Sequence, residues 1–270
     1  MNFLCTTLFR NVSIGFCLLT FSTANTAQVP FTGSAKYALK QTASTIIKKT
    51  QPKPDAASGA AKSKAALRTG TTSYQAKIES GTQTVKVTTK RTITEEGGAW
   101  VITEIAQSQQ GQARDQITLE KASLKPLKRS VKQGPMMLDL VFKEDKVIGT
   151  MTTNGNTNPV DIDISGPVFS DGAGFDAYIS TLPLAVGYTT TLSIFNLQKL
   201  KPQNVQLSVT GSERVTVPAG TFEAFKLSSK SLESDLSTTE YWIAKETRKV
   251  LKAVLSLPQA GVTITAELMP

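Results

Sequence analysis

The chain has 270 residues, with 30 lysines and arginines against 21 aspartates and glutamates, two cysteines and no histidine. Without histidine, Ser-His-Asp and Cys-His triads, histidine-ligated zinc sites and imidazole general bases are excluded. The cysteines, Cys5 and Cys17, both lie near the start of the chain, so the remainder can form no disulfide. A hydrophobic fraction of 40% allows a buried core, which excludes wholesale disorder.

Residues 1–24 have the pattern of a secretory signal peptide. A positively charged start precedes an apolar stretch of about ten residues, which small residues follow. We predict cleavage after Ala24, with Ala27 as the alternative site. Polar residues interrupt the apolar stretch, which argues against a membrane anchor, and the residues before Cys17 depart from a lipid-attachment motif. The predicted location is therefore periplasmic or secreted, in a bacterium.

Residues 25–70 are predicted to form a basic, mostly disordered linker. Residues 28–70 hold eight basic residues and one acidic residue, whereas residues 71–270 hold 21 basic and 20 acidic residues. The linker is rich in proline, alanine, glycine, serine and lysine, which rarely anchor a core. Such a segment is either a solvated tail or a tether to an anionic envelope surface. The residues predicted to bind that surface are Lys36, Lys40, Lys48, Lys49, Lys53, Lys62, Lys64 and Arg68. Nucleic acid is not expected as a partner, because the linker lacks interleaved aromatic residues for base stacking.

From residue 71 onward, apolar and polar residues alternate with the period of β-strands. Tyr74, Ala76 and Ile78 would share one face of the first strand, and Gly97-Gly98 is typical of a hairpin loop. In all, roughly a dozen such segments recur at the spacing of antiparallel sheets. We predict one mainly β domain over residues 71–270. It is either a strongly curved antiparallel sheet or a β-barrel, with a two-sheet sandwich as the alternative.

Residues 171–183 break this alternation. Apolar and aromatic residues recur there with helical spacing, Asp171 can cap the start of a helix, and Pro183 can end it. We predict one short helix covering an opening or edge of the sheet. A curved sheet can enclose an apolar interior that binds a lipid or another apolar small molecule. The residues predicted to line the core or such a pocket are Trp100, Phe142, Phe175, Tyr178 and Trp242.

The C-terminal third carries the string Val217-Pro218-Ala219-Gly220-Thr221-Phe222, followed by Tyr241-Trp242-Ile243-Ala244 and Thr247-Arg248-Lys249-Val250. These motifs resemble a bacterial exported family of domains of unknown function marked by a VPAGTF turn. The similarity extends over residues 71–268 and is diagnostic within residues 170–252. The resemblance implies a periplasmic, mainly β domain, broadly similar to curved-sheet lipoprotein carriers and lipocalin-like binders. It implies no established activity.

The residues of these motifs also have a structural interpretation. Proline at position 218 pre-sets its backbone angle, and Gly220 can adopt a positive φ, so the pair predicts a tight turn between two strands. We further expect Arg248 to pair with Glu246 or Glu240 at the rim of a hairpin.

Few residues suggest chemistry. Asp161 and Asp163 share one strand face but alternate with Ile162 and Ile164, which is typical of a solvated face rather than a catalytic pair. The acidic residues of segment 171–176 lack the spacing of a calcium-binding EF-hand loop. The sequence contains no GxGxxG, GxxxxGK[ST] or CxxC motif. We therefore predict no catalytic residue, no metal site and no cofactor, and a protein that is not an enzyme.

Three functional hypotheses remain open. The first is a binding module that holds a lipid or apolar molecule inside the curved sheet. The second is an envelope scaffold tethered to an anionic surface by the basic linker. The third, which the sequence favours least, is an enzyme that works with carboxylates alone.

Overall fold

The computed structural model describes residues 66–233 and 237–270. The predicted signal peptide, most of the predicted linker and its lysines lie outside these residues. The described strands are β1 (Gly70–Ser80), β2 (Gln83–Glu96), β3 (Ala99–Ser108), β4 (Gly111–Glu120), β5 (Pro126–Gln133), β6 (Met136–Phe142), β7 (Lys146–Thr153), β8 (Asn156–Asp163), β9 (Phe169–Ser170), β10 (Thr189–Asn196), β11 (Lys201–Val217), β12 (Gly220–Ser231), β13 (Thr238–Ala244), β14 (Val250–Leu257) and β15 (Val262–Leu268). The described helices are α1 (Ala173–Thr181) and the single 3₁₀ turn η1 (Pro258–Ala260).

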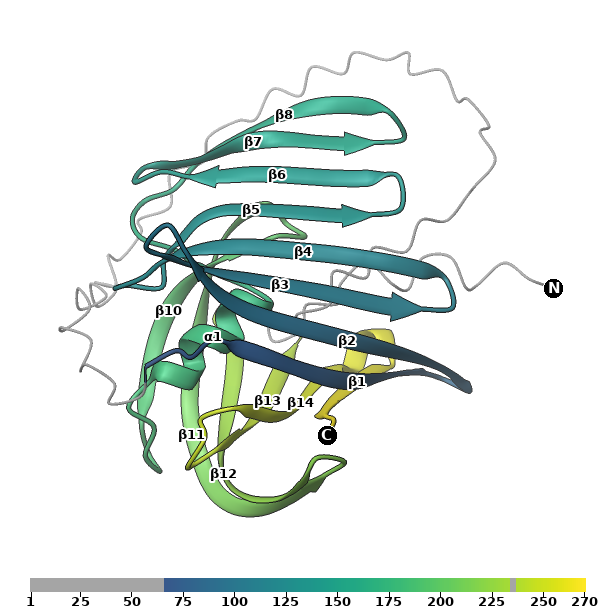
Figure 1. Cartoon of the computed structure of the whole chain (residues 1–270), viewed down its shortest axis with the longest axis vertical. Helices are drawn as coiled ribbons and strands as arrows, with labels where there is room; N and C mark the ends of the chain where they lie inside the picture. The colour runs from purple at the N-terminus through teal and green to yellow at the C-terminus, as the bar shows by residue number, and fades with distance from the viewer. Residues whose placement is uncertain (1–65, 234–236) are drawn as a thin grey trace, which may run out of the picture. The chain divides into compact units, whose positions relative to one another are not determined.

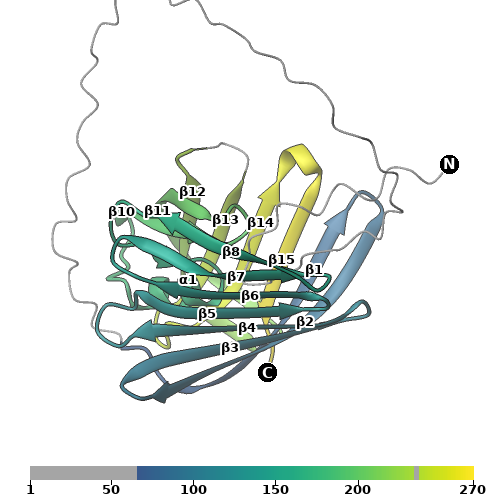
Figure 2. The ribbon, with the colours of Figure 1, turned by 90° about the horizontal axis from the view of Figure 1, so that it is seen from above.

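These strands form one curved sheet in the order β8-β7-β6-β5-β4-β3-β2-β1-β15-β14-β13-β12-β11-β10-β9. Neighbouring strands are antiparallel, apart from β9 and β10, which pair in parallel over two residues. The sheet bends so that the teal strands β3–β8 lie across from the green and yellow strands β10–β14 (Figures 1 and 2). The predicted curved antiparallel sheet with one short α-helix is confirmed.

The sheet does not close into the barrel that the sequence left open as an alternative. Its two end strands, β8 and β9, form no ladder with each other within the described residues. Side chains join the two ends of the sheet instead. Buried residues of β5–β8 form one cluster with Phe195 of β10, and the ring of Phe142 packs edge-on against that of Phe195 with centroids 5.5 Å apart. Pro159 lies within β8 and lacks a backbone N–H, which suits an edge strand. Nor do the strands separate into two stacked sheets.

Local patterns behave as expected from the sequence. Tyr74, Ala76 and Ile78 are all buried on β1. The hairpin between β11 and β12 turns at Val217-Pro218-Ala219-Gly220, where Gly220 adopts a φ of 133°. Asp161 and Asp163 are exposed, and Asp161 pairs with Lys146 at 2.8 Å.

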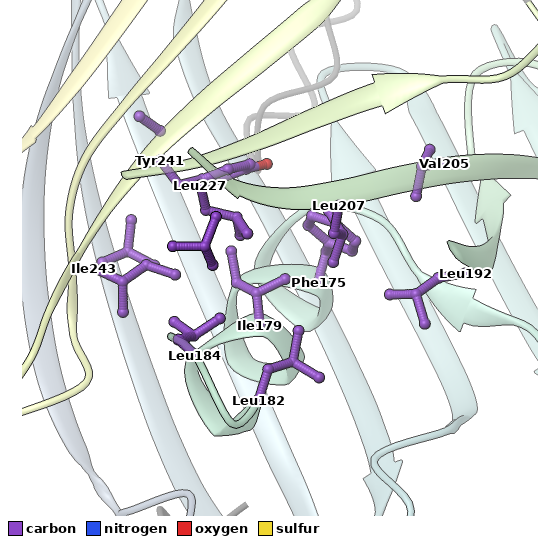
Figure 3. Close-up of a cluster of buried hydrophobic side chains, with 13 residues drawn as sticks. Phe175, Ile179, Leu182, Leu184, Leu192, Val205, Leu207, Leu227, Tyr241 and Ile243 are labelled. Atoms are coloured by element: carbon purple, nitrogen blue, oxygen red, sulfur yellow. The ribbon is translucent and has the colours of Figure 1, made fainter. Parts of the chain in front are cut away.

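Helix α1 lies between the two halves of the sheet and contacts both. One face buries Phe175 and Ile179 against strands β10–β14, where Leu207, Leu227 and Ile243 point toward the helix (Figure 3). The other face packs its small residues against β3 and β4, in a cluster made of Trp100, Ile102, Ile117, Leu119, Leu124, Ala173 and Ala177. Among the residues that the structure describes, no helix is long and apolar enough to cross a membrane.

Candidate functional site

The start of α1 differs from the sequence prediction. The helix begins after Gly172, whose φ is 64°, and no side chain caps it. Asp171, predicted as the cap, instead forms an ion pair with Arg129 and accepts a hydrogen bond from the backbone N–H of Leu197 at 2.8 Å. The helix ends at Thr181, and Leu182 returns to extended backbone before Pro183, as predicted.

A first buried ion-pair network fastens α1 to β2 and β3. Arg91 on β2 donates from Nε to Glu104 Oε2 on β3, at 2.8 Å, and from Nη2 to Asp176 Oδ2 on α1, also at 2.8 Å. All three residues are buried. The guanidinium also lies 5.1 Å from the centre of the Tyr74 ring, a cation–π distance.

A second buried network joins β4 and β5 to the segment before α1. Arg129 on β5 holds Asp115 on β4 through two hydrogen bonds, Nε to Oδ1 at 3.0 Å and Nη2 to Oδ2 at 2.6 Å. Its Nη1 donates to Ser170 Oγ at 3.0 Å and to Asp171. Removing one partner from such a buried pair leaves an uncompensated charge and costs about 3–5 kcal/mol. The two networks thus fix α1 within the sheet.

Burial and neighbouring charges have opposite effects on the pKa values of the first network. Burial raises the pKa of Glu104 to about 7, although Arg91 opposes this shift. Burial also raises the pKa of Asp176, again against the effect of Arg91. For Arg91 itself, burial lowers the pKa, but Glu104 and Asp176 outweigh burial and raise it overall. The network therefore contains a fixed cation and a carboxyl group that titrates near neutral pH.

A cavity of about 360 Å³, here called the Arg248 cavity, lies beside α1. Its wall comes from four separate stretches of chain: 66–74, 91–93, 173–180 and 247–250. The lining residues are Ala66, Leu67, Arg68, Thr69, Gly70, Thr71, Thr72, Tyr74, Arg91, Ile93, Ala173, Asp176, Ala177, Ser180, Thr247, Arg248, Lys249 and Val250. The cavity thus combines apolar wall residues with several cationic ones.

A smaller cavity of about 180 Å³, here called the Gln203 cavity, is lined by residues before and at the start of α1 and by strands β10–β14. Polar side chains of its lining form hydrogen bonds with one another. Gln203 accepts a hydrogen bond from Asn196 Nδ2 at 3.1 Å and donates from Nε2 to Ser231 Oγ at 2.5 Å. Asn196, Gln203 and Ser231 thus form one chain of hydrogen bonds within the lining.

The five aromatic residues predicted from the sequence are not brought together around one cavity. Trp100 packs against α1, Phe142 against Phe195, and Trp242 in a separate cluster with Tyr74 and Leu268. Phe175 lines the Gln203 cavity. Tyr178 stacks on Phe169, with ring centroids 4.0 Å apart. A ligand-binding role for these residues stays a prediction.

The turn between β13 and β14 places Arg248 differently from the predicted rim pair. Glu240 pairs with Lys226 at 3.1 Å instead. The guanidinium of Arg248 lies 5.4 Å from the centre of the Phe225 ring and lines the Arg248 cavity. Of the predicted surface-binding residues, Arg68 alone is described; it is exposed and lines the same cavity.

The sequence analysis did not identify the buried charged residues. Glu104 lies at the inward parity of Trp100 and Ile102 on β3, and Asp115 at that of Ile117 on β4. A charged residue at an inward position of a strand whose other inward residues are apolar was therefore the signal by which the sequence could have revealed these residues. The pattern does not reveal the partners, because Arg91 lies 13 residues from Glu104 and 85 residues from Asp176.

Three solved structures are similar to this chain, at low identity and low TM-score. The hypothetical lipoprotein YmcC from Escherichia coli K12 is 9% identical, has a TM-score of 0.30, and is matched over 74% of this chain and 84% of that chain. A candidate exported protein with a YmcC-like fold from Bacteroides fragilis is 8% identical, with a TM-score of 0.28 and coverage of 77% and 97%. A DUF1329 family protein from Desulfovibrio piger is 11% identical, with a TM-score of 0.28 and coverage of 74% and 84%.

A comparison with curated proteins found no match. The model of one protein family, described as "Protein of unknown function (DUF3108)", matches residues 69–267, which span the sheet from β1 to β15. The match confirms the resemblance to a family of unknown function that the VPAGTF turn indicated. This chain belongs to the DUF3108 family of proteins of unknown function.

Proposed function

We propose that this protein binds a lipid or another apolar small molecule in the Arg248 cavity. The observation that carries the proposal is the cavity itself, whose volume of about 360 Å³ is within the size range of small-molecule pockets. Leu67, Ile93, Ala177 and Val250 supply apolar walls. Because the wall includes α1, the start of the described chain and the turn between β13 and β14, it depends on the fully folded sheet.

Binding rather than catalysis is the activity we propose. Arg91 and Asp176 are the buried charged residues of the cavity wall, and they are paired with each other at 2.8 Å. Each is thus engaged in holding α1 in place. The signal-peptide pattern of residues 1–24 supports a periplasmic or secreted location for this binding activity.

A bulky side chain in the cavity tests this proposal. Ser180 lines the cavity near the end of α1, and the adjacent Thr181 does not. Both are half-buried, and each hydroxyl donates to the carbonyl three residues earlier. We expect Ser180→Trp to abolish binding of a fluorescent fatty acid, while Thr181→Trp retains it. Titrations would be run on the full mature chain after circular dichroism has verified folding. Equal binding by the two variants, or no binding by the wild type, would contradict the proposal.

A second candidate function rests on the distribution of charge. Residues 28–70 carry eight basic residues and one acidic residue, so this segment would tether the β domain to an anionic envelope surface as a scaffold. Deleting residues 28–70 should release the protein from vesicles that contain phosphatidylglycerol, and high salt should do the same for the intact chain. Unchanged co-sedimentation with the vesicles would reject the tether.

A further inference from the structure

We propose that the Arg248 cavity selects single-chain amphiphiles with an anionic head group, such as fatty acids, and that Arg248 binds the head group. This inference rests on the proposed function and specifies the chemistry of its ligand. Three observations carry it: the charge of the cavity wall, the position of Arg248, and the apolar surface beside the charges.

The cavity wall carries an excess of positive charge. Its described charged residues are Arg68, Arg91, Arg248, Lys249 and Asp176. Arg91 and Asp176 form a buried pair with each other, so they present little net charge to a ligand. The remaining three cations form no ion pair with another described residue. Arg68 and Lys249 are exposed and Arg248 is half-buried, so three cations border the cavity and it favours an anion over a neutral or cationic group.

Arg248 is held ready for such an anion. Its φ is 60°, and its backbone N–H donates to the carbonyl of Ala244 at 3.0 Å, which fixes the turn between β13 and β14. The guanidinium lies against the ring of Phe225, at 5.4 Å. Its Nη1 is buried and has no hydrogen-bond partner among the described residues. A buried donor without an acceptor is costly, and a carboxylate or phosphate matches the planar fork of a guanidinium.

The rest of the wall suits an alkyl chain. Ala173 and Ala177 on α1 present small side chains to the cavity, and Leu67, Ile93 and Val250 complete an apolar surface. The segment Ala66–Thr69 forms one wall, directly before β1 begins. A head group near Arg248 would therefore place its chain along apolar residues, as an amphiphile requires.

The test compares ligands that share one chain length. Decanoate, decanol and decyltrimethylammonium differ in the charge of the head group, and acetate supplies the carboxylate without the chain. We expect the wild-type protein to bind decanoate most tightly, decanol more weakly and decyltrimethylammonium least. Acetate should compete only at far higher concentration. The measurement is isothermal titration calorimetry at low and high salt, where higher salt should reduce the preference for decanoate.

Variants assign the preference to Arg248. Arg248→Gln should bind decanoate roughly tenfold to hundredfold more weakly than the wild type, because it loses a charge-assisted hydrogen bond. Its affinity for decanol should change little. Arg248→Lys should recover part of the loss, because it keeps the charge but not the planar fork. Arg214→Gln serves as the matched control, since Arg214 is exposed and does not line the cavity.

The outcomes separate the two claims. If decanoate and decanol bind equally well and Arg248→Gln changes neither, the head-group inference is overturned while the proposed function stands. If acetate competes as well as decanoate, the site takes free anions and the amphiphile is rejected. If no ligand with an alkyl chain binds the wild-type protein, both claims fail together.

Discussion

Glu104 shows how burial and a neighbouring cation set the properties of a single side chain. It is one of two buried carboxylates that share Arg91, and Asp115 lies next to it on β4. Desolvation is the largest influence on Glu104 and raises its pKa to about 7, from an ordinary value of 4.5. The folded protein consequently holds this proton more tightly than the unfolded chain does.

This proton gives a testable pH dependence. Between pH 4.5 and about 7 the folded state keeps the Glu104 proton, whereas the unfolded state releases it. The free energy of unfolding should therefore increase as the pH falls through this window, by up to about 1.4 kcal/mol per pH unit. Glu104→Gln should flatten this dependence, so the free energy of unfolding of the variant should compare most favourably with that of the wild type above pH 7. Urea denaturation between pH 4.5 and 8.5 measures the effect.

The raised pKa of Asp176 acts in the same direction, so the Glu104→Gln variant should keep a residual slope. Asp163→Asn is the control, because Asp163 is exposed and its replacement should leave the slope as in the wild type. An unflattened curve for Glu104→Gln would contradict the assigned pKa.

At the scale of elements, α1 fits the sheet because a glycine lets it approach closely. A Cβ atom at position 174 would lie 2.9 Å from Ser170 Cβ and 3.1 Å from Ile117 Cδ1. Ser170 in turn accepts a hydrogen bond from Arg129. Gly174 thus allows the helix, the segment before it and β4 to meet.

We expect Gly174→Ala to destabilise the protein, because overpacking a core usually costs about 1–3 kcal/mol. Alanine favours helix by about 1 kcal/mol over glycine, which offsets only part of this cost. The matched control is Gly211→Ala on β11, where an added Cβ atom meets nothing within 4 Å. Chemical denaturation of both variants measures the difference. A more stable Gly174→Ala variant would show that the helix can shift without loss.

The elements also show which strands a pattern can reveal. Strand β1 alternates in the ordinary way and is recognisable from residues 74–78 alone. Strand β5 is not recognisable in this way, because its inward positions hold Arg129 and Val131 while Leu127 is exposed. A buried arginine removes the apolar period on which strand prediction depends. Charged residues at inward positions are also the reason why the two buried ion-pair networks were not identified from the sequence.

At the scale of the whole described domain, α1 joins the two halves of one sheet. The end strands of these halves, β8 and β9, form no ladder with each other in the described part of the chain. Phe175 and Ile179 belong to the core of β10–β14, while Ala173 and Ala177 belong to that of β3 and β4. The Arg248 cavity borders α1, whose Ala173, Ala177 and Ser180 form part of its wall. Anything that loosens α1 should therefore alter the cavity as well.

The sequence by itself determined most of the strands and turns, the short helix α1 and the class of the fold. These features depend on alternation, helical spacing and the backbone preferences of glycine and proline, which act over a few residues. Only the tertiary structure decided that the sheet stays open, that Arg91 and Arg129 anchor α1, and that Arg248 lines a cavity with Arg68. Those contacts join residues tens to more than a hundred positions apart, and their energies depend on burial that no local pattern encodes.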